Sequence, residues 1–315
     1  MGTYRNRFGP HNSEETYVPH AFAEHLVDLG EVQMNYATVG DASQPALLLI
    51  PGQSESWWGY EDALALLADH FNAFAVDLRG QGRSSRTPGR YTLDLMGNDL
   101  VRFIDTVIGR PTYVSGLSSG GVLSAWLSAY AKPGQVIAAH YEDPPLFASE
   151  LTPATGSSVR HGIGPMFNMW STFLGDQWNI GDWEGMQAAA PTFLPEWMAA
   201  FGGGASEPPQ NLKEYDPEWG RAFWSGTIAA SCDHARMLGQ VKVPVLFTHH
   251  FRVVNDEGVL MGAISDVQAE RVRALVAGAG QPFDYRSFPK MGHSFHGQDP
   301  KLFTETVVDW VSTLR

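Results

Sequence analysis

The sequence has 315 residues, with 21 Lys and Arg against 34 Asp and Glu, so its formal charge at pH 7 is −13. Hydrophobic residues make up 43% of the chain, enough to fill a core, which excludes a disordered or fibrous protein. The negative charge works against binding to nucleic acid or anionic lipid, because both require a basic surface. We therefore predict small neutral or apolar partners, no nucleic acid and no membrane.

Cysteine content and the N-terminal segment bear on the cellular compartment. Cys232 is the only cysteine, so no intramolecular disulfide can form. The segment Met1–His20 is polar and contains no apolar signal region. Both features favour a cytoplasmic protein.

Apolar runs of strand length alternate with amphipathic helical segments, which is typical of a parallel sheet with helices on both faces. The predicted strands are Val32–Val39, Ala46–Ile50, Phe74–Asp77, Thr112–Ser115, Val136–Tyr141, Val243–Thr248 and Phe283–Phe288. The predicted helices are Asp62–Asp69, Asp94–Ile108, Ser119–Ala131, Asp266–Ala277 and Pro300–Leu314. The sequence therefore predicts an α/β fold with a mostly parallel central sheet.

The alternation breaks between Pro144 and Ala235, where Trp, Met, Pro and Gly are abundant and no strand is evident. We predict that residues 144–235 form an inserted helical cap and that residues 1–143 and 236–315 form the core. Tryptophans either surround an apolar ligand beneath such a cap or form the cap's own core. Those in this segment are Trp170, Trp178, Trp183, Trp197, Trp219 and Trp224.

A motif for nucleophilic catalysis lies between a predicted strand and a predicted helix. Residues 116–120 read G-L-S-S-G and fit the G-x-S-x-G nucleophile elbow. The backbone of this turn is strained and requires small neighbours, which Gly116 and Gly120 supply. The turn exposes the hydroxyl of Ser118 at the carboxyl edge of the sheet. We predict that Ser118 is the nucleophile.

A serine hydroxyl needs a general base, and the base needs a group that orients it. His293 follows the last predicted strand, in a loop that would reach the nucleophile at the carboxyl edge of the sheet. His249 and His250 end a strand and could be polar groups of a pocket, whereas His296 is interpreted as a loop residue. The histidine spacing does not fit a hydrolytic metal centre, so we predict no metal.

Two places can supply the orienting carboxylate. Glu142 and Asp143 end the strand that follows the nucleophile, and Asp256 and Glu257 lie in the loop after the next predicted strand. Chain order in this fold class places the acid between the serine and the histidine. Both places satisfy that order, so position alone does not decide between them.

The oxyanion formed during acyl transfer needs two preorganised N–H donors. One is predicted to be the backbone of Ser119, directly after the nucleophile. The other is predicted to be the backbone of Gln53, in the turn P-G-Q-S that follows the strand Ala46–Ile50. The polar turn Asp77–Ser84, D-L-R-G-Q-G-R-S, is predicted to be structural.

These motifs together resemble the α/β-hydrolase fold over essentially the whole chain. More narrowly, four segments are similar to the zearalenone lactonases, in particular to a bacterial branch: residues 116–120, 141–144 (Y-E-D-P), 216–221 (D-P-E-W-G-R) and 291–293 (M-G-H). The resemblance implies a Ser-Glu-His triad. It assigns the carboxylate to Glu142, which has the family's separation from Ser118, and the substrate-contacting cap tryptophan to Trp219.

The resemblance also implies an activity, which is hydrolysis of a macrocyclic resorcylic acid lactone such as the mycotoxin zearalenone. The resemblance implies that no cofactor is needed and that the protein forms a homodimer. The turn residues Gly52 and Ser54 are expected to contact the substrate together with Trp219.

Two alternatives remain open. The chain could be a general carboxylesterase or a carbon–carbon bond hydrolase of the same fold, or a non-catalytic binding protein like the hormone receptors built on it. Dehalogenase and epoxide hydrolase activities are disfavoured, because those enzymes have Asp at the elbow.

Overall fold

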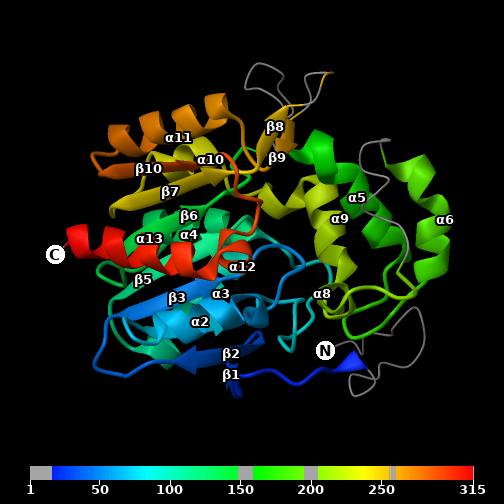
Figure 1. Cartoon of the computed structure of the whole chain (residues 1–315), viewed down its shortest axis with the longest axis horizontal. Helices are drawn as coiled ribbons and strands as arrows, with labels where there is room; N and C mark the ends of the chain where they lie inside the picture. Colours follow the sequence, from blue (N-terminus) through cyan, green and yellow to red (C-terminus); the bar gives the residue numbers. More distant parts are fainter. Residues whose placement is uncertain (1–15, 148–158, 195–204, 255, 257–259, 315) are drawn as a thin grey trace.

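The computed structural model describes residues 16–147, 159–194, 205–254, 256 and 260–314. An eight-stranded sheet with the order β1-β2-β4-β3-β5-β6-β7-β10 forms its centre (Figure 1). Its strands are β1 (Glu24–Asp28), β2 (Gln33–Val39), β3 (Ala46–Ile50), β4 (Asn72–Val76), β5 (Thr112–Leu117), β6 (Val136–Glu142), β7 (Val245–His250) and β10 (Phe283–Phe288). A separate antiparallel pair consists of β8 (Arg252–Val254) and β9 (Leu260–Gly262).

Most neighbouring strands of the sheet run parallel. β2 is antiparallel to both β1 and β4, and every other neighbouring pair is parallel. The predicted fold class, a mostly parallel sheet with helices on both faces, is confirmed. Since parallel strands share one carboxyl edge, the residues that follow β3, β5, β6, β7 and β10 can meet there.

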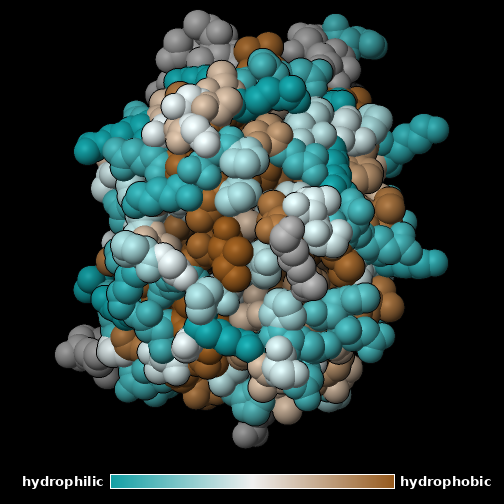
Figure 2. Space-filling model, turned by 90° about the vertical axis from the view of Figure 1, so that its left-hand side faces the viewer, coloured by the Kyte–Doolittle hydropathy of each residue, from teal (hydrophilic) through white to brown (hydrophobic). Residues whose placement is uncertain are grey.

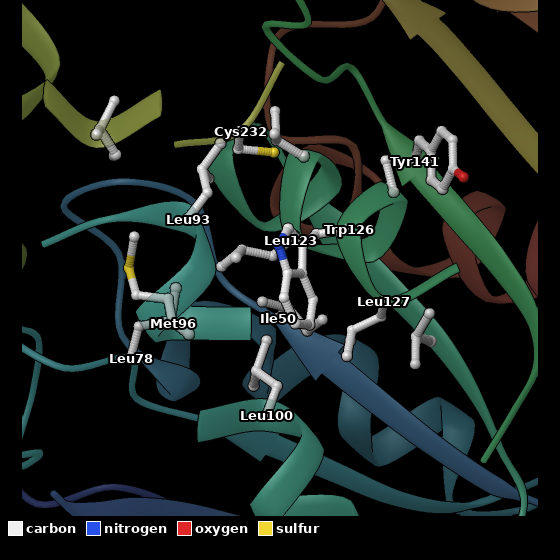
Figure 3. Packing of buried hydrophobic residues seen from close by; sticks show 14 of the residues in the cluster. Ile50, Leu78, Leu93, Met96, Leu100, Leu123, Trp126, Leu127, Tyr141 and Cys232 are labelled. Carbon is white, nitrogen blue, oxygen red and sulfur yellow. The ribbon is translucent and has the colours of Figure 1, made fainter. Parts of the chain in front are cut away.

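Two hydrophobic cores cover the two faces of the sheet. Strand β3 shows the division: Leu47 and Leu49 belong to one core, and Leu48 and Ile50 to the other. Successive side chains of a strand point to opposite faces, so a strand buried on both sides is apolar throughout. Figure 3 shows Ile50 packed with residues of the second core, among them Leu100 and Leu123.

The helices that contribute to each core come from different parts of the chain. On the face of Leu47 lie α2 (Glu61–Leu67), α12 (Phe295–Gln298) and α13 (Pro300–Thr313), and the 3₁₀ helix η1 (Trp57–Tyr60) joins them. On the face of Leu48 lie α3 (Leu93–Phe103) with its π-helical continuation η2 (Ile104–Ile108), α4 (Ser119–Tyr130), α10 (His234–Leu238) and α11 (Asp266–Gly278).

A group of helices lies beside the sheet in Figure 1. It comprises α5 (Val159–Phe173), α6 (Trp183–Phe193), α8 (Gln210–Lys213), α9 (Pro217–Ser225) and the 3₁₀ helix η5 (Thr227–Ala229), and we call it the helical group. It falls within the segment predicted as the cap, whose boundaries stay a prediction. Two residues named above, Trp197 and Glu257, lie outside the described residues.

Hydrogen bonds join the helical group to the turn Asp77–Ser84. The amide of Asp216 donates to the carbonyl of Gly80 at 2.7 Å, and the indole of Trp178 donates to the carbonyl of Gly82 at 2.7 Å. Arg86 adds a salt bridge to Asp216 at 3.1 Å. This turn therefore positions the helical group relative to the sheet.

The predicted elements differ from the observed ones mainly at strand ends. β7 runs from Val245 to His250 rather than from Val243 to Thr248, and β1, β8 and β9 were not predicted. β1 is an edge strand whose side chains are mostly exposed, so it lacks an apolar pattern. β8 and β9 are three residues each, too short to show a period.

In the view of Figure 2, hydrophilic residues predominate around a central group of hydrophobic ones. None of the helices that the structure describes is long and apolar enough to cross a membrane.

Close packing between α4 and β3 makes Gly120 a sensitive position. A Cβ at Gly120 would overlap the carbonyl oxygens of Ile50 and Pro51, which are backbone atoms that cannot turn aside. We expect Gly120→Ala to lower the free energy of unfolding by about 1 to 3 kcal/mol. Denaturant unfolding of the purified variant measures this loss.

Gly278 is the matched control, because it ends α11 and a new Cβ there meets nothing within 4 Å. Gly278→Ala should be neutral or stabilise by up to about 1 kcal/mol. Equal unfolding midpoints for the two variants would contradict the packing argument.

Candidate active site

Ser118 lies in a strained turn between β5 and α4, as the sequence motif predicts. Its backbone angles are φ 55° and ψ −119°, and its amide donates to the carbonyl of Glu142 at 2.8 Å. A Cβ at Gly116 would overlap the carbonyl of Gly120, so the turn requires glycine at that position. The turn thus places Ser118 at the carboxyl edge of the sheet, next to the end of β6.

His293 and Ser118 line one cavity of about 400 Å³ at this edge. His293 follows β10, and its Nδ1 lies 2.7 Å from Oδ2 of Asp143. The Asp143 side chain is fully buried, whereas that of His293 is 37% exposed. Since Nδ1 is engaged by the carboxylate, Nε2 is the nitrogen that remains to accept a proton.

The carboxylate beside His293 is not the one that the resemblance assigned. Glu142 is fully buried, and both of its oxygens lie 3.1 Å from Nδ1 of His296. Glu142 is the last residue of β6, and Asp143 follows it with φ at 41°. Because consecutive side chains point in different directions, the two carboxylates reach different histidines. The structure thus pairs His293 with Asp143, whereas the expected contact was with Glu142.

Asp256, the other acid considered, does not contact His293. Asp256 is exposed, and no bond joins it to His293 in the part of the chain that the structure describes. The geometry therefore favours the position after β6 over the loop after β7.

His250 supports the loop that carries His293. Its Nδ1 lies 2.6 Å from the carbonyl of Gly292 and 3.8 Å from the carboxylate of Asp143. Its ring is fully buried and does not line the cavity. His249 points away, bonding the carbonyl of Ile264 and the hydroxyl of Tyr285. The interpretation of these two histidines as pocket groups is thus wrong for this cavity.

The charge of Asp143 affects the basicity of His293. Burial alone would lower the pKa of His293, but the hydrogen bond and the charge of Asp143 outweigh it. The pKa of His293 therefore lies above its ordinary value. A raised pKa makes the imidazole a better proton acceptor once it is neutral.

The predicted oxyanion turn lies against the nucleophile. Gly52, Gln53 and Ser54 all line the cavity, and a Cβ at Gly52 would lie 3.3 Å from Cβ of Ser118. Ser119 is the first residue of α4, so its N–H has no carbonyl acceptor within the helix. The structure therefore brings together the turn and the helix start from which the two N–H donors are predicted to come.

Residues of the segment that contains the helical group form hydrogen bonds with the turn that carries Gln53 and Ser54. Nε2 of Gln53 donates to the hydroxyl of Tyr215 at 2.6 Å, and Nδ2 of Asn211 donates to the carbonyl of Ser54 at 2.9 Å. Asn211 also lines the cavity, as does Trp58. Sequence reasoning missed both residues, because nothing local marks a side chain that arrives from α8 or η1.

Trp219 does not line this cavity. Its side chain is fully buried in the helical group, with ring centroids 6.4 Å from Tyr91 and 6.2 Å from Tyr215. Its Nε1 has no hydrogen-bond partner in the described structure. The geometry therefore agrees with the alternative in which a cap tryptophan forms part of the cap's own core.

In the ranges that the structure describes, no group of three or more His, Cys, Asp or Glu residues is arranged so that it could hold a metal ion.

The parallel sheet and the serine at its strand-to-helix turn define a class of protein, and sequence comparison agrees. Residues 47–306 match the model of the alpha/beta hydrolase family. That match covers most of the sequence, so the chain belongs to the alpha/beta hydrolase family.

Individual relatives are distant. The chain is 30% identical over 100 residues to 3-oxoadipate enol-lactonase 2 of Acinetobacter baylyi, which is 32% of this chain and 38% of that protein. It is 26% identical over 125 residues to epoxide hydrolase 4 of Mus musculus, which is 38% of this chain and 34% of that protein. The matches thus span little more than a third of either relative.

Solved structures agree over a longer stretch. An enol-lactonase from Burkholderia xenovorans LB400 superposes with a TM-score of 0.65 at 20% identity, covering 91% of this chain and 100% of that one. The E-2-(acetamidomethylene)succinate hydrolase superposes with a TM-score of 0.63 at 18% identity, covering 92% and 99%. At these identities the likeness shows the fold alone.

The contact between Asp143 and His293 generates a prediction. Asp143→Asn should favour the wrong imidazole tautomer and lower kcat by up to about 10⁴-fold. It should also lower the pKa of His293, since a carboxylate stabilises the imidazolium. The acid limb of the kcat/KM profile should then move to lower pH. Steady-state kinetics across pH measure both effects.

Asp256→Asn is the control, because Asp256 is exposed and makes no contact with His293. Its kcat should stay within about 2-fold of wild type. A large loss in Asp256→Asn with a small one in Asp143→Asn would assign the acid to the later loop.

Proposed function

We propose that the protein is a serine hydrolase of esters or lactones, with Ser118 as nucleophile, His293 as general base and Asp143 as the carboxylate that orients it. One observation carries the proposal: the 2.7 Å contact between His293 and a buried carboxylate lies at the cavity that Ser118 also lines. Acyl transfer requires a nucleophile, a base and an acid that orients the base, and candidates for all three lie at this cavity or directly beside it.

The chemistry follows from these positions. Ser118 Oγ attacks the ester carbonyl carbon while Nε2 of His293 takes its proton, and the negative charge develops on the carbonyl oxygen. The amides of Gln53 and Ser119 donate to that oxygen. His293 then returns the proton to the leaving alkoxide, which leaves an acyl group on Ser118. Water, deprotonated by His293, then attacks the acyl carbon; the bond to Ser118 Oγ breaks, the acid is released, and His293 returns the proton to Oγ.

Distant relatives support the ester or lactone class. Two proteins similar to this chain are named as enol-lactonases. Others are epoxide hydrolases, but this chain has the hydroxyl of Ser118 at the elbow and not the carboxylate on which that chemistry relies. The serine at the elbow therefore favours acyl transfer.

Within this class we propose zearalenone, or a similar macrocyclic resorcylic acid lactone, as substrate. Support comes from the resemblance of the motifs and from apolar surface near the site, which Trp58 and Leu117 provide in the cavity. A second cavity of about 290 Å³ within the helical group is mainly apolar, and its lining includes Met166, Met169, Trp170, Trp183, Met186 and Leu212. We also propose that residues 144–235 act as the cap, and that Gly52 and Ser54, which line the cavity, contact the substrate.

Removing the nucleophile tests the reaction class. Ser118→Ala should leave the fold intact and lower kcat for zearalenone by about 10⁴- to 10⁶-fold, because triad members act as a unit. The variant should also resist labelling by a fluorophosphonate that reacts with the wild-type protein. Hydrolysis is followed by chromatography, and folding by circular dichroism.

Three outcomes separate the alternatives. Near-native turnover by folded Ser118→Ala would exclude the covalent mechanism. A wild-type protein that cleaves short nitrophenyl esters but not zearalenone would be a general esterase. A wild-type protein that neither reacts with the fluorophosphonate nor hydrolyses any ester would be a binding protein.

Trp219→Phe tests the substrate contact that the resemblance implies for this buried residue. The substitution keeps an aromatic ring and removes the unpaired Nε1 donor, so the melting temperature should stay close to that of wild type. If substrate accepts a hydrogen bond from that N–H, kcat/KM for zearalenone should fall by about 10-fold while kcat/KM for nitrophenyl acetate stays constant. Unchanged kinetics on both esters would identify Trp219 as a packing residue only.

A further inference from the structure

A second cluster of ionisable residues, in which His296 and Glu142 are fully buried, lies beside the proposed triad. His296 is fully buried, and each of its two ring nitrogens faces a carboxylate. Nδ1 lies 3.1 Å from both oxygens of Glu142, and Nε2 lies 3.2 Å from Oε1 of Glu55. A neutral imidazole can donate through only one nitrogen, whereas an imidazolium donates through both. With both carboxylates ionised, the geometry therefore favours the protonated ring.

The surroundings of the ring agree with this charge state. Burial alone would lower the pKa of His296, but Glu142 and Glu55 outweigh it and raise the pKa to about 10. The ring stacks on Tyr60 with centroids 3.7 Å apart. The hydroxyl of Ser294 lies 3.4 Å from Nε2 of His296, and the ring centroid of Phe303 lies 5.7 Å from that of His296. The nearby histidines His140 and His250 help to lower the pKa of Glu142.

One end of this cluster is joined to the loop of the proposed base. Glu142 accepts a hydrogen bond from the amide of Phe295 at 2.8 Å and one from the amide of His296 at 3.3 Å. These residues follow His293 by two and three positions, and Glu142 itself precedes Asp143. The end of β6 thus contacts both the proposed base, His293, and the segment Phe295–His296 that follows it.

The other end is joined to the oxyanion turn. Oε2 of Glu55 accepts a hydrogen bond from the amide of Gly52 at 3.0 Å, and Glu55 also lines the cavity. Gly52 is the residue that packs directly on Ser118, and Gln53 follows it. The chain of contacts Glu142–His296–Glu55–Gly52 therefore connects the loop of His293 with the turn of Gly52 and Gln53. Acyl transfer requires these two parts of the site to keep a fixed position relative to each other.

We propose that His296 is a positioning residue, whose protonated ring between Glu142 and Glu55 fixes the oxyanion turn relative to Ser118 and His293. The inference rests on the proposed hydrolase function of that site. Loss of the ring would leave Glu55 free to release the amide of Gly52. Small displacements of an oxyanion donor cost rate, because the donors act only where charge develops in the transition state.

Kinetics of His296→Gln test the positioning role. Gln retains a donor but cannot bridge two carboxylates, so kcat for a nitrophenyl ester should fall by about 10²-fold while KM changes by less than about 3-fold. Rates are normalised to active sites titrated with a fluorophosphonate, so that unfolded protein does not count.

His249→Gln is the matched control, because His249 is also fully buried on its side chain but bonds Ile264 and Tyr285, away from the cavity. It should lose stability and keep its kcat per active site. Equal losses of kcat in the two variants, or none in His296→Gln, would overturn the proposal.

A titration by NMR tests the charge state without any substrate. In protein labelled at histidine, the His296 signal is the one that disappears in His296→Gln. It should not titrate between about pH 5.5 and 8.5 in the wild type, and its titration should move to lower pH in Glu55→Gln. A wild-type His296 signal that titrates near its ordinary pKa would overturn the proposal. Failure of the hydrolase function would instead appear as activity insensitive to Ser118→Ala.

Discussion

Ser118 is held at φ 55° and ψ −119°, a region that residues other than glycine rarely adopt. Such a conformation costs about 1 to 3 kcal/mol and persists only where the surroundings enforce it. Here β5 enters the turn and α4 leaves it at such close range that Gly116 and Gly120 cannot carry a side chain. The serine hydroxyl therefore stands clear of the sheet edge, and every other group of the proposed site is arranged around that point.

The end of β6 is the second constraint, because two consecutive carboxylates there contact two different histidines. Asp143 contacts His293 and Glu142 contacts His296. Each carboxylate is fully buried, so each needs a charged or donating partner to offset its desolvation. The two pairs together tie the end of β6 to the loop after β10, which fixes where the proposed base can lie.

The helical group completes the cavity from the opposite side. Tyr215 and Asn211 bond the turn that carries Gln53, and Asp216 is anchored on the turn after β4. The cavity walls thus come from segments that are more than 150 residues apart in the sequence. A shift of the helical group would therefore change both the shape of the cavity and the position of the proposed oxyanion donors.

The sequence by itself determined the alternation of strands and helices, the elbow at Ser118, the turn after β3 and the late histidine. Each of these is a local pattern, in which periodicity or a short motif reflects the backbone that the residues must adopt. Only the tertiary structure showed that Asp143 contacts His293 while Glu142 contacts His296, and that Trp219 is fully buried beside Tyr91 and Tyr215. The physical reason is that these outcomes depend on the direction of a side chain at a strand end and on which distant residue it meets. Adjacent residues of the same chemical type are alike in sequence, and they become different only when the fold turns one toward His293 and the other toward His296.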